Sequence, residues 1–312
     1  MAVPNLSEID IRNILNDKNI ISIELVQRSG QKLVAKVFIE NTTYLVKFIQ
    51  IPNFCIDDLD NDNFDKDDAT FGRLRREINI LKSCNCESLV QVLSDDLMHT
   101  VYNNKHIFYY TEEFINGSDL QTLLNNHYNF SIPDVINFAL CINSAIAALW
   151  QHSIIHRDIK PQNIILNSIK NNFVLIDPGI AFDLQDISFT QAGSIVGTAT
   201  FMSPEQLNPN NRRSLDFRSD HFLLGICMYL LLTGIHPFYF GADSIYVVHD
   251  NIVRKKHLSL KEVRQDVPID LSKLIDRLLS KEPHMRYRST QLLEDELLKI
   301  KNSLTNKSEV IV

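Results

Sequence analysis

His156-Arg157-Asp158-Ile159-Lys160-Pro161-Gln162-Asn163 is the stretch of sequence that decides the fold of this chain. It places an imidazole, a guanidinium, a carboxylate, an ammonium and an amide close together. Apolar runs flank it, Ser153-Ile154-Ile155 before and Ile164-Ile165-Leu166 after. The reactive groups are therefore expected on a loop that a rigid scaffold presents, as catalytic loops are. The alternative is an ordinary polar turn between a helix and a strand.

Length and composition limit the classes of protein that fit. The 312 residues suffice for one two-lobed unit or two small domains, with 45% hydrophobic and 22% charged residues. The net charge of -7 argues against nucleic acid as a partner. The five scattered cysteines fit a reducing compartment, and Cys84-x-Cys86 lacks the second pair of a zinc site. With no signal peptide and no apolar run of membrane-spanning length in view, we expect a cytoplasmic protein without a membrane partner.

The hydrophobic pattern predicts the order of the elements. Runs rich in β-branched and aromatic residues predict strands at 20–26, 33–39, 43–49, 89–93 and 107–112. Helical spacing predicts helices at 7–16, 70–83, 133–152 and 290–304, with Ser7 and Ser131 as the caps of the first and the third. Residues 57–68 carry a run of aspartates, which is read as a solvated loop or as a docking site for a basic partner.

The motif His-Arg-Asp-x-Lys-Pro-x-Asn resembles the catalytic loop of eukaryotic-type (Hanks-type) serine/threonine protein kinases, in a form that fits a bacterial source. The resemblance implies an α+β, bilobal fold. A small lobe at 20–113 would hold a five-stranded antiparallel sheet and a helix, and a larger, mainly α-helical lobe would span 114–305. Residues 1–19 would be a helical extension and 306–312 a tail. In the loop, Asp158 would accept or orient the proton of the attacking hydroxyl, Lys160 would steady the phosphoryl group, and Asn163 would bind magnesium.

Lys47 lies in the middle of an apolar strand, where a lysine is costly to bury unless it is paired. It resembles the strand lysine that holds the α- and β-phosphates of ATP, and Glu77 resembles its helix partner. The alternative is an edge lysine that points to solvent. In the preceding turn only Gly30 matches the glycine-rich loop of the family. Val34 then matches the valine after that loop, unless the register shifts to Val37.

Residues 113–120 resemble the hinge that bonds the adenine edge. Glu113 and Ile115 on the hinge, and Ile165 after the catalytic loop, complete the ATP-binding residues that the resemblance implies. Glu112 falls at the gatekeeper position, an unusual residue for a pocket wall, unless the alignment slips by one residue. Leu45 replaces a small alanine that the family usually has over the adenine.

A magnesium ligand is expected at Asp177-Pro178-Gly179, which resembles the Asp-Phe-Gly motif of the family. Carboxylate oxygens are hard ligands that suit magnesium. Pro178 replaces the phenylalanine, which removes the aromatic packing that separates active from inactive states. Read alone, the three residues are a simple turn.

The activation segment is expected to end at Ser203-Pro204-Glu205, where Glu205 would pair with Arg286 in a buried ion pair. Asp220 would hold the backbone of the catalytic loop. Arg157 would receive a phosphate from the segment, for which Ser188, Thr190 and Ser194 are candidates. Thr198 would face Asp158 and Lys160. The alternative is that these hydroxyls belong to a polar surface loop.

All five chemistry positions are filled by competent residues. They are Lys47, Glu77, Asp158, Asn163 and Asp177. We therefore expect a kinase that uses ATP and Mg²⁺, or Mn²⁺, to phosphorylate serine and threonine hydroxyls of proteins, and that autophosphorylates in trans as a homodimer. One rival is a nucleotide-binding pseudokinase scaffold, which the glycine-poor turn, Leu45 and Pro178 would favour. The other is a small-molecule kinase, against which Lys160-Pro161 and the segment at 203–205 argue.

Overall fold

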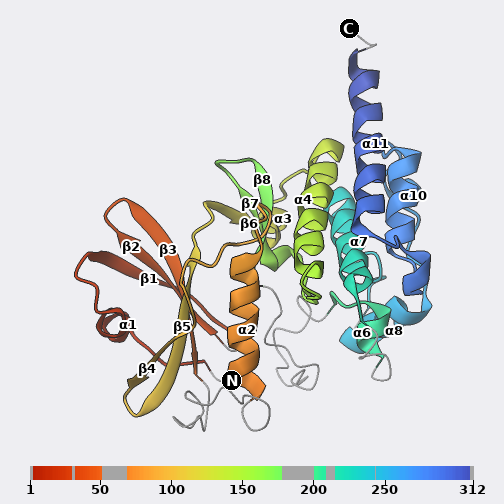
Figure 1. Ribbon diagram of the computed structural model, residues 1–312. Helices are drawn as coiled ribbons and strands as arrows, with labels where there is room; N and C mark the ends of the chain where they lie inside the picture. Colours follow the sequence, from red (N-terminus) through yellow and green to blue (C-terminus); the bar gives the residue numbers. More distant parts are fainter. Residues whose placement is uncertain are drawn as a thin grey trace. The chain divides into compact units, whose positions relative to one another are not determined.

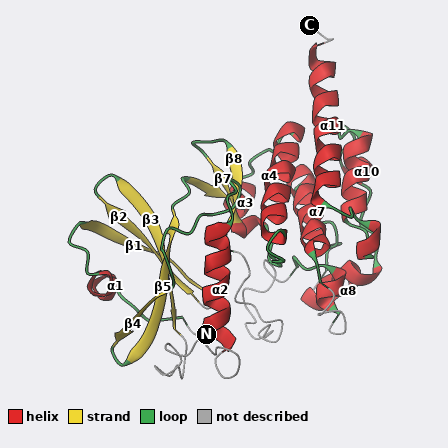
Figure 2. Ribbon diagram, in the orientation of Figure 1, coloured by secondary structure: helices red, strands yellow, loops and turns green. Residues whose placement is uncertain are grey.

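The computed structural model describes residues 3–29, 32–50, 69–177, 200–208, 215–242 and 244–309. The chain divides into two compact units. The first comprises Met1–Asn85 and Val90–Ile115, and the second comprises Cys86–Leu89 and Asn116–Val312. Strands dominate the first unit and helices the second (Figures 1 and 2).

The first unit is built on a five-stranded sheet with the order β1-β2-β3-β5-β4, in which all neighbouring strands are antiparallel. This confirms the predicted sheet. The strands are β1 (Ile20–Ser29), β2 (Lys32–Ile39), β3 (Thr42–Gln50), β4 (Met98–Tyr102) and β5 (Lys105–Glu113).

The predicted fourth strand is wrong. Residues 89–93 form only isolated bridges, from Leu89 to Leu175 and from Val92 to Glu112. The strand is Met98–Tyr102, which pairs with β5 through a hairpin. Its turn residues Asn103 and Asn104 have φ values of 51° and 59°. Two successive positive φ values are typical of a type I′ turn, which matches the twist of the paired strands.

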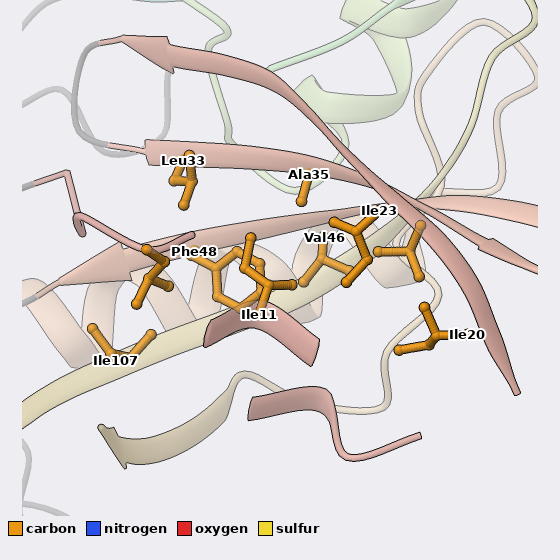
Figure 3. Packing of buried hydrophobic residues seen from close by; sticks show 10 residues of the cluster. Ile11, Ile20, Ile23, Leu33, Ala35, Val46, Phe48 and Ile107 are labelled. Carbon is orange, nitrogen blue, oxygen red and sulfur yellow. The ribbon is translucent and has the colours of Figure 1, made fainter. Parts of the chain in front are cut away.

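Helix α1 (Glu8–Leu15) packs on one face of this sheet. Ile11 is fully buried in a cluster with Val46, Phe48 and Ile107, and Figure 3 shows it pointing at these strand residues. Ile9 of the same helix is 72% exposed and lies outside this cluster. A capping box joins Ser7 and Asp10, as the sequence predicts.

Helix α2 (Ala69–Ser83) packs on the opposite face of the sheet. Its Phe71 ring lies 5.2 Å from that of Phe108, whereas the neighbouring Ile107 belongs to the cluster under α1. Successive strand residues point to opposite faces, so the two helices cover different sides.

The second unit is mainly helical. Its longer helices are α4 (Ile132–Trp150), α7 (Phe217–Thr233), α8 (Ile245–Arg254), α10 (Ile269–Leu278) and α11 (Thr290–Glu309). Its short elements are α3 (Leu120–Asn125), α6 (Pro204–Leu207), α9 (Leu260–Val263), η2 (Pro161–Asn163) and η4 (Pro283–Met285). A small antiparallel sheet joins β6 (Gly117–Asp119), β7 (Ile164–Asn167) and β8 (Asn172–Leu175).

Helix α4 delivers the chain to the loop that begins at His156. Ser131 caps it, as the sequence predicts, and the structure adds a capping box with Asp134 and places a proline in the first turn. The helix is long and apolar enough to cross a membrane, but half of its apolar window is buried against the rest of the unit. It contacts α7 and α11, so it serves as a core helix of this unit.

Candidate functional site

The loop between α4 and β7 gathers two predicted residues around the carboxylate of a third, Asp158. Lys160 Nζ donates to Asp158 Oδ2 at 2.7 Å, and Asn163 Nδ2 donates to the same oxygen at 2.8 Å. Asn163 Nδ2 also donates to the backbone oxygen of Asp158 at 2.9 Å. Lys160 and Asn163 are each 8% exposed, so the carboxylate is held by groups that packing fixes in place.

The surroundings of Asp158 raise its pKa above the ordinary value. Burial is the largest cause, and the charge of Asp177 adds to it, while Lys160 and Asn163 act in the opposite direction. A carboxylate with a raised pKa binds a proton more readily and is therefore a better general base at neutral pH. The influence of Asp177 shows that the two carboxylates lie close enough to interact.

One backbone hydrogen bond and one side-chain contact join the loop to Ile176, the residue before Asp177. Ile176 N donates to the Asn163 carbonyl at 2.8 Å, and His156 Nε2 lies 3.3 Å from the Ile176 carbonyl. Arg157 and Asp177 both have positive φ values, of 66° and 49°. Non-glycine residues adopt this conformation at a cost and cluster at functional sites, where the surrounding structure holds them in place.

Asp220 ties this loop to helix α7. Its carboxylate accepts the backbone N–H groups of His156 and Arg157, each at 2.8 Å. Burial raises the pKa of Asp220 to about 7, although these two hydrogen bonds oppose the shift. Gln206, which the sequence did not single out, donates to the Arg157 carbonyl at 2.9 Å. The loop backbone is thus held from two elements that lie far from it in the sequence.

A bidentate ion pair joins Glu205 to Arg286, with N–O distances of 2.6 and 2.9 Å. Arg286 is 1% exposed and also donates to the carbonyl groups of Arg218, Ser280 and Lys281. Burial acts to raise the pKa of Glu205, but Arg286 and a hydrogen bond from Ser219 hold it below its ordinary value. The charged nitrogen and oxygen atoms of this buried pair are therefore all hydrogen-bonded.

In the first unit, Lys47 Nζ lies 2.6 Å from Glu112 Oε2, and the two residues are 2% and 1% exposed. The alternative of a solvent-facing edge lysine is therefore wrong. Glu77 lies within α2, but its side chain is outside the described residues, so its pairing with Lys47 stays a prediction. Glu112 was noted in the sequence only as an odd gatekeeper, and its pairing with Lys47 was missed.

The remaining predicted nucleotide contacts are placed on several strands. Val34 is buried on β2 directly opposite Lys47, and Ile165 is partly buried on β7. Glu113 exchanges bonds with Gln91, because its N–H donates to the Gln91 carbonyl and its carboxylate accepts the Gln91 N–H. Ile115 is 6% exposed at the end of the first unit.

Several predicted residues lie outside the described residues. They are Gly30, the acidic run at 57–68, Pro178, Gly179, Ser188, Thr190, Ser194 and Thr198. Arg157, their expected phosphate receiver, is described, and its Nε is buried without a hydrogen-bond partner in the described part of the chain. The phosphorylation sites therefore stay predictions.

Comparison with known proteins gives one family. The family described as "Protein kinase domain" matches residues 52–298. Serine/threonine-protein kinase PknB of Mycolicibacterium smegmatis is 31% identical over 238 residues, which are 75% of this chain and 37% of that protein. Probable serine/threonine-protein kinase CPE1738 of Clostridium perfringens is 26% identical over 278 residues, which are 89% of this chain and 38% of that protein. The chain thus spans less than two fifths of these relatives.

Solved structures share the fold. The kinase domain of PknI from Mycobacterium tuberculosis matches with a TM-score of 0.60 and 17% identity, over 90% of this chain and 96% of that one. Rad53 residues 1–466 in complex with AMP-PNP match with a TM-score of 0.66 and 22% identity, over 91% of this chain and 65% of that one. These matches confirm the fold class that the sequence predicts.

Proposed function

Because the chain belongs to the protein kinase domain family, we propose that it transfers the γ-phosphoryl group of ATP to serine and threonine hydroxyls of proteins. One observation carries the proposal: Lys160 and Asn163 converge on a single oxygen of Asp158, whose pKa burial raises. A fixed carboxylate of this kind is what the orientation and deprotonation of a hydroxyl need. The names of the bacterial relatives support serine and threonine as acceptors.

Each residue of the loop has a separate task in this reaction. The Asp158 oxygen that is not shared with Lys160 and Asn163 faces the acceptor hydroxyl and takes its proton. Lys160, anchored on Asp158, supplies positive charge that steadies the transferring phosphoryl group. Asp220 keeps the backbone at His156 and Arg157 fixed, so that these groups need not reorganise during the reaction.

Asn163 and Asp177 of the second unit offer oxygen ligands that fit a divalent cation. In the described part of the chain, both side-chain bonds of Asn163 are made by Nδ2, which leaves its Oδ1 as an acceptor. Oδ1 and the carboxylate of Asp177 are hard oxygen ligands of the kind that Mg²⁺ prefers, with Mn²⁺ as an alternative. When bound, the cation neutralises charge on the phosphate oxygens.

We assign the nucleotide phosphates to Lys47, with Glu77 as its helix partner. The resemblance further assigns nucleotide contacts to Gly30, Val34, Glu113, Ile115 and Ile165. A pseudokinase scaffold is not favoured, because all five polar positions are retained and the relatives are named as kinases. The proposed partners are proteins that carry serine or threonine, including a second copy of the chain in trans-autophosphorylation. The free cysteines Cys84, Cys86, Cys141 and Cys227 support a cytoplasmic location.

The proposal is tested by incubating the purified chain with γ-labelled ATP and Mg²⁺ and following label on protein serine and threonine. Asp158→Asn should lower the rate about 100-fold or more, because the amide cannot take a proton. Asp266→Asn, at an exposed aspartate on a surface ion pair, is the matched control and should keep the rate. Wild-type labelling by Asp158→Asn, or no labelling by the wild type, would contradict the assignment.

A further inference from the structure

The Lys47–Glu112 pair is built entirely within the sheet of the first unit. Strands β3 and β5 are antiparallel neighbours, with Lys47 opposite Tyr110 and Leu45 opposite Glu112. Lys47 and Glu112 are therefore diagonal neighbours on one face of the sheet, within reach of long side chains. Their charged atoms lie 2.6 Å apart, which is a short, charge-assisted hydrogen bond.

The burial of both residues makes the pair mutually dependent. Lys47 is 2% exposed and Glu112 is 1% exposed, and removing one charge of a buried ion pair is costly because it takes a partner from the other. On the same face of β5 as Glu112, Phe108 is fully buried and Tyr110 is 3% exposed. A glutamate is therefore unusual in these aromatic surroundings, where a buried charge requires a partner.

The side-chain carboxylate of Glu112 pairs with Lys47. Within the described residues its Oε1 has no hydrogen-bond partner, so the carboxylate is not part of a wider structural network. Oε2 alone is engaged, and it engages Lys47. Since an ammonium carries three N–H donors, a bond to Glu112 is compatible with simultaneous contacts to phosphate oxygens.

We propose that Glu112 is a positioning residue that fixes the Lys47 ammonium on the sheet for the phosphates of the nucleotide. This rests on the proposed function, in which Lys47 binds those phosphates. The sheet then holds the lysine through β5, in addition to any partner that helix α2 supplies. Glu112 itself touches neither phosphate nor acceptor, and it acts through the position and the charge of Lys47.

The test compares Glu112→Gln with wild type by nucleotide titration. The amide keeps the size of the side chain and one acceptor oxygen but removes the counter-charge of Lys47. The Kd for ATP should rise about 10-fold, because the ammonium of Lys47 loses the charge-assisted bond that holds it on the sheet. The Kd for adenosine, which has no phosphates, should not change. Glu24→Gln, at an exposed glutamate of the same sheet, is the matched control and should bind both ligands as wild type does.

Two further variants, Lys47→Ala and Glu112→Asp, distinguish a failure of the proposed role of Lys47 from a failure of the proposed role of Glu112. If Lys47→Ala binds ATP as wild type does, the proposed role of Lys47 fails. If Lys47→Ala loses affinity while Glu112→Gln keeps the ATP affinity of wild type, only the role of Glu112 fails. An equal loss of ATP and adenosine affinity in Glu112→Gln would also overturn it, since that marks general damage. Should Glu112→Gln not fold, Glu112→Asp draws the charge back by one methylene, and wild-type ATP affinity in that variant overturns the proposal.

Discussion

At the scale of single residues, opposing influences set the pKa of Asp158. Burial and the charge of Asp177 raise its pKa, and the ammonium of Lys160, 2.7 Å away, lowers it. The carboxylate is therefore more basic than an exposed aspartate, and Lys160 limits the size of that shift. This balance makes the pH dependence of the reaction sensitive to one neighbouring lysine.

Replacing Lys160 with methionine should disturb that balance in a defined direction. Without the ammonium the pKa of Asp158 rises further, so the base is protonated at a higher pH than in wild type. The acidic limb of kcat/KM should move to higher pH, and the plateau should fall at least about 10-fold through loss of charge stabilisation. Rates of phosphoryl transfer from pH 5 to 9 measure both effects.

Lys170→Met is the matched control for this change. Lys170 is an exposed lysine near the β7–β8 turn, with 58% of its side chain accessible. Its removal should leave the profile in place. An acidic limb at the wild-type position in Lys160→Met would show that Asp158 is not the group that titrates.

The chemistry of the loop could be predicted from the sequence because its residues are neighbours along the chain. Asp158, Lys160 and Asn163 meet through local geometry, so one motif specifies them. The pair of Lys47 and Glu112 depends instead on the register of two strands that lie far apart in the sequence. The available signal was a glutamate within an apolar strand, but the pattern alone did not say which charge it meets.

At the scale of elements, helix α1 covers the apolar side chains on one face of the sheet of the first unit. Ile11 fills the space over Val46 and Phe48, while Tyr102 donates to Asp10 and Arg12 donates to the Ile20 carbonyl. The capping box of the helix was predictable because Ser7 and Asp10 are three residues apart. The strand at Met98–Tyr102 was missed because none of its residues is fully buried and the hydrophobic pattern is weak, although Asn103-Asn104 marks its turn.

Ile11→Ala should destabilise the first unit by about 2–5 kcal/mol, because it leaves a cavity in a closed apolar cluster. Urea unfolding followed by circular dichroism gives the free energy. Ile9→Ala in the same helix is the control, since Ile9 is 72% exposed, and its effect should stay within about 0.5 kcal/mol. Equal losses in the two variants would mean that α1 contributes through helix propensity and not through burial.

At the scale of the whole molecule, the loop at 156–163 is held by hydrogen bonds from residues of the second unit that lie far away in the sequence. Asp220 holds the loop at 156–163 from α7, Gln206 holds it from α6, and Arg286 anchors Glu205 on that same helix. The resemblance named Asp220, Glu205 and Arg286, because their motifs stand in the expected order in the sequence. Gln206 carries no motif of its own, so only the folded chain reveals its contact.

The core of the second unit also contains a buried histidine that links three helices. His221 on α7 is fully buried and lies 3.1 Å from Asn143 Oδ1 on α4, through its Nε2. Asn143 Nδ2 then donates to the Thr290 carbonyl at the start of α11. Burial lowers the pKa of His221 to about 3, the charges of Arg286 and Arg218 act in the same direction, and Asp216 opposes them. The histidine is therefore neutral in the folded protein at neutral pH, with Nε2–H as the donor.

This histidine should make the second unit sensitive to acid. Its pKa is depressed on folding, from about 6.5 in the unfolded chain, so only the unfolded chain binds the proton between pH 6.5 and 3. Stability from this group is complete above about pH 6.5 and is lost as the pH falls, by up to about 1.4 kcal/mol per pH unit. Asp220, whose pKa is raised to about 7, changes stability in the opposite direction, so the difference between wild type and a His221 variant is the quantity to measure.

Urea unfolding at pH 7, 6 and 5 should show that the free energy of unfolding falls less steeply with acid in His221→Gln than in wild type. The control His284→Gln, at an exposed histidine, should follow wild type. Parallel losses in wild type and His221→Gln would mean that His221 is not the source of the acid sensitivity.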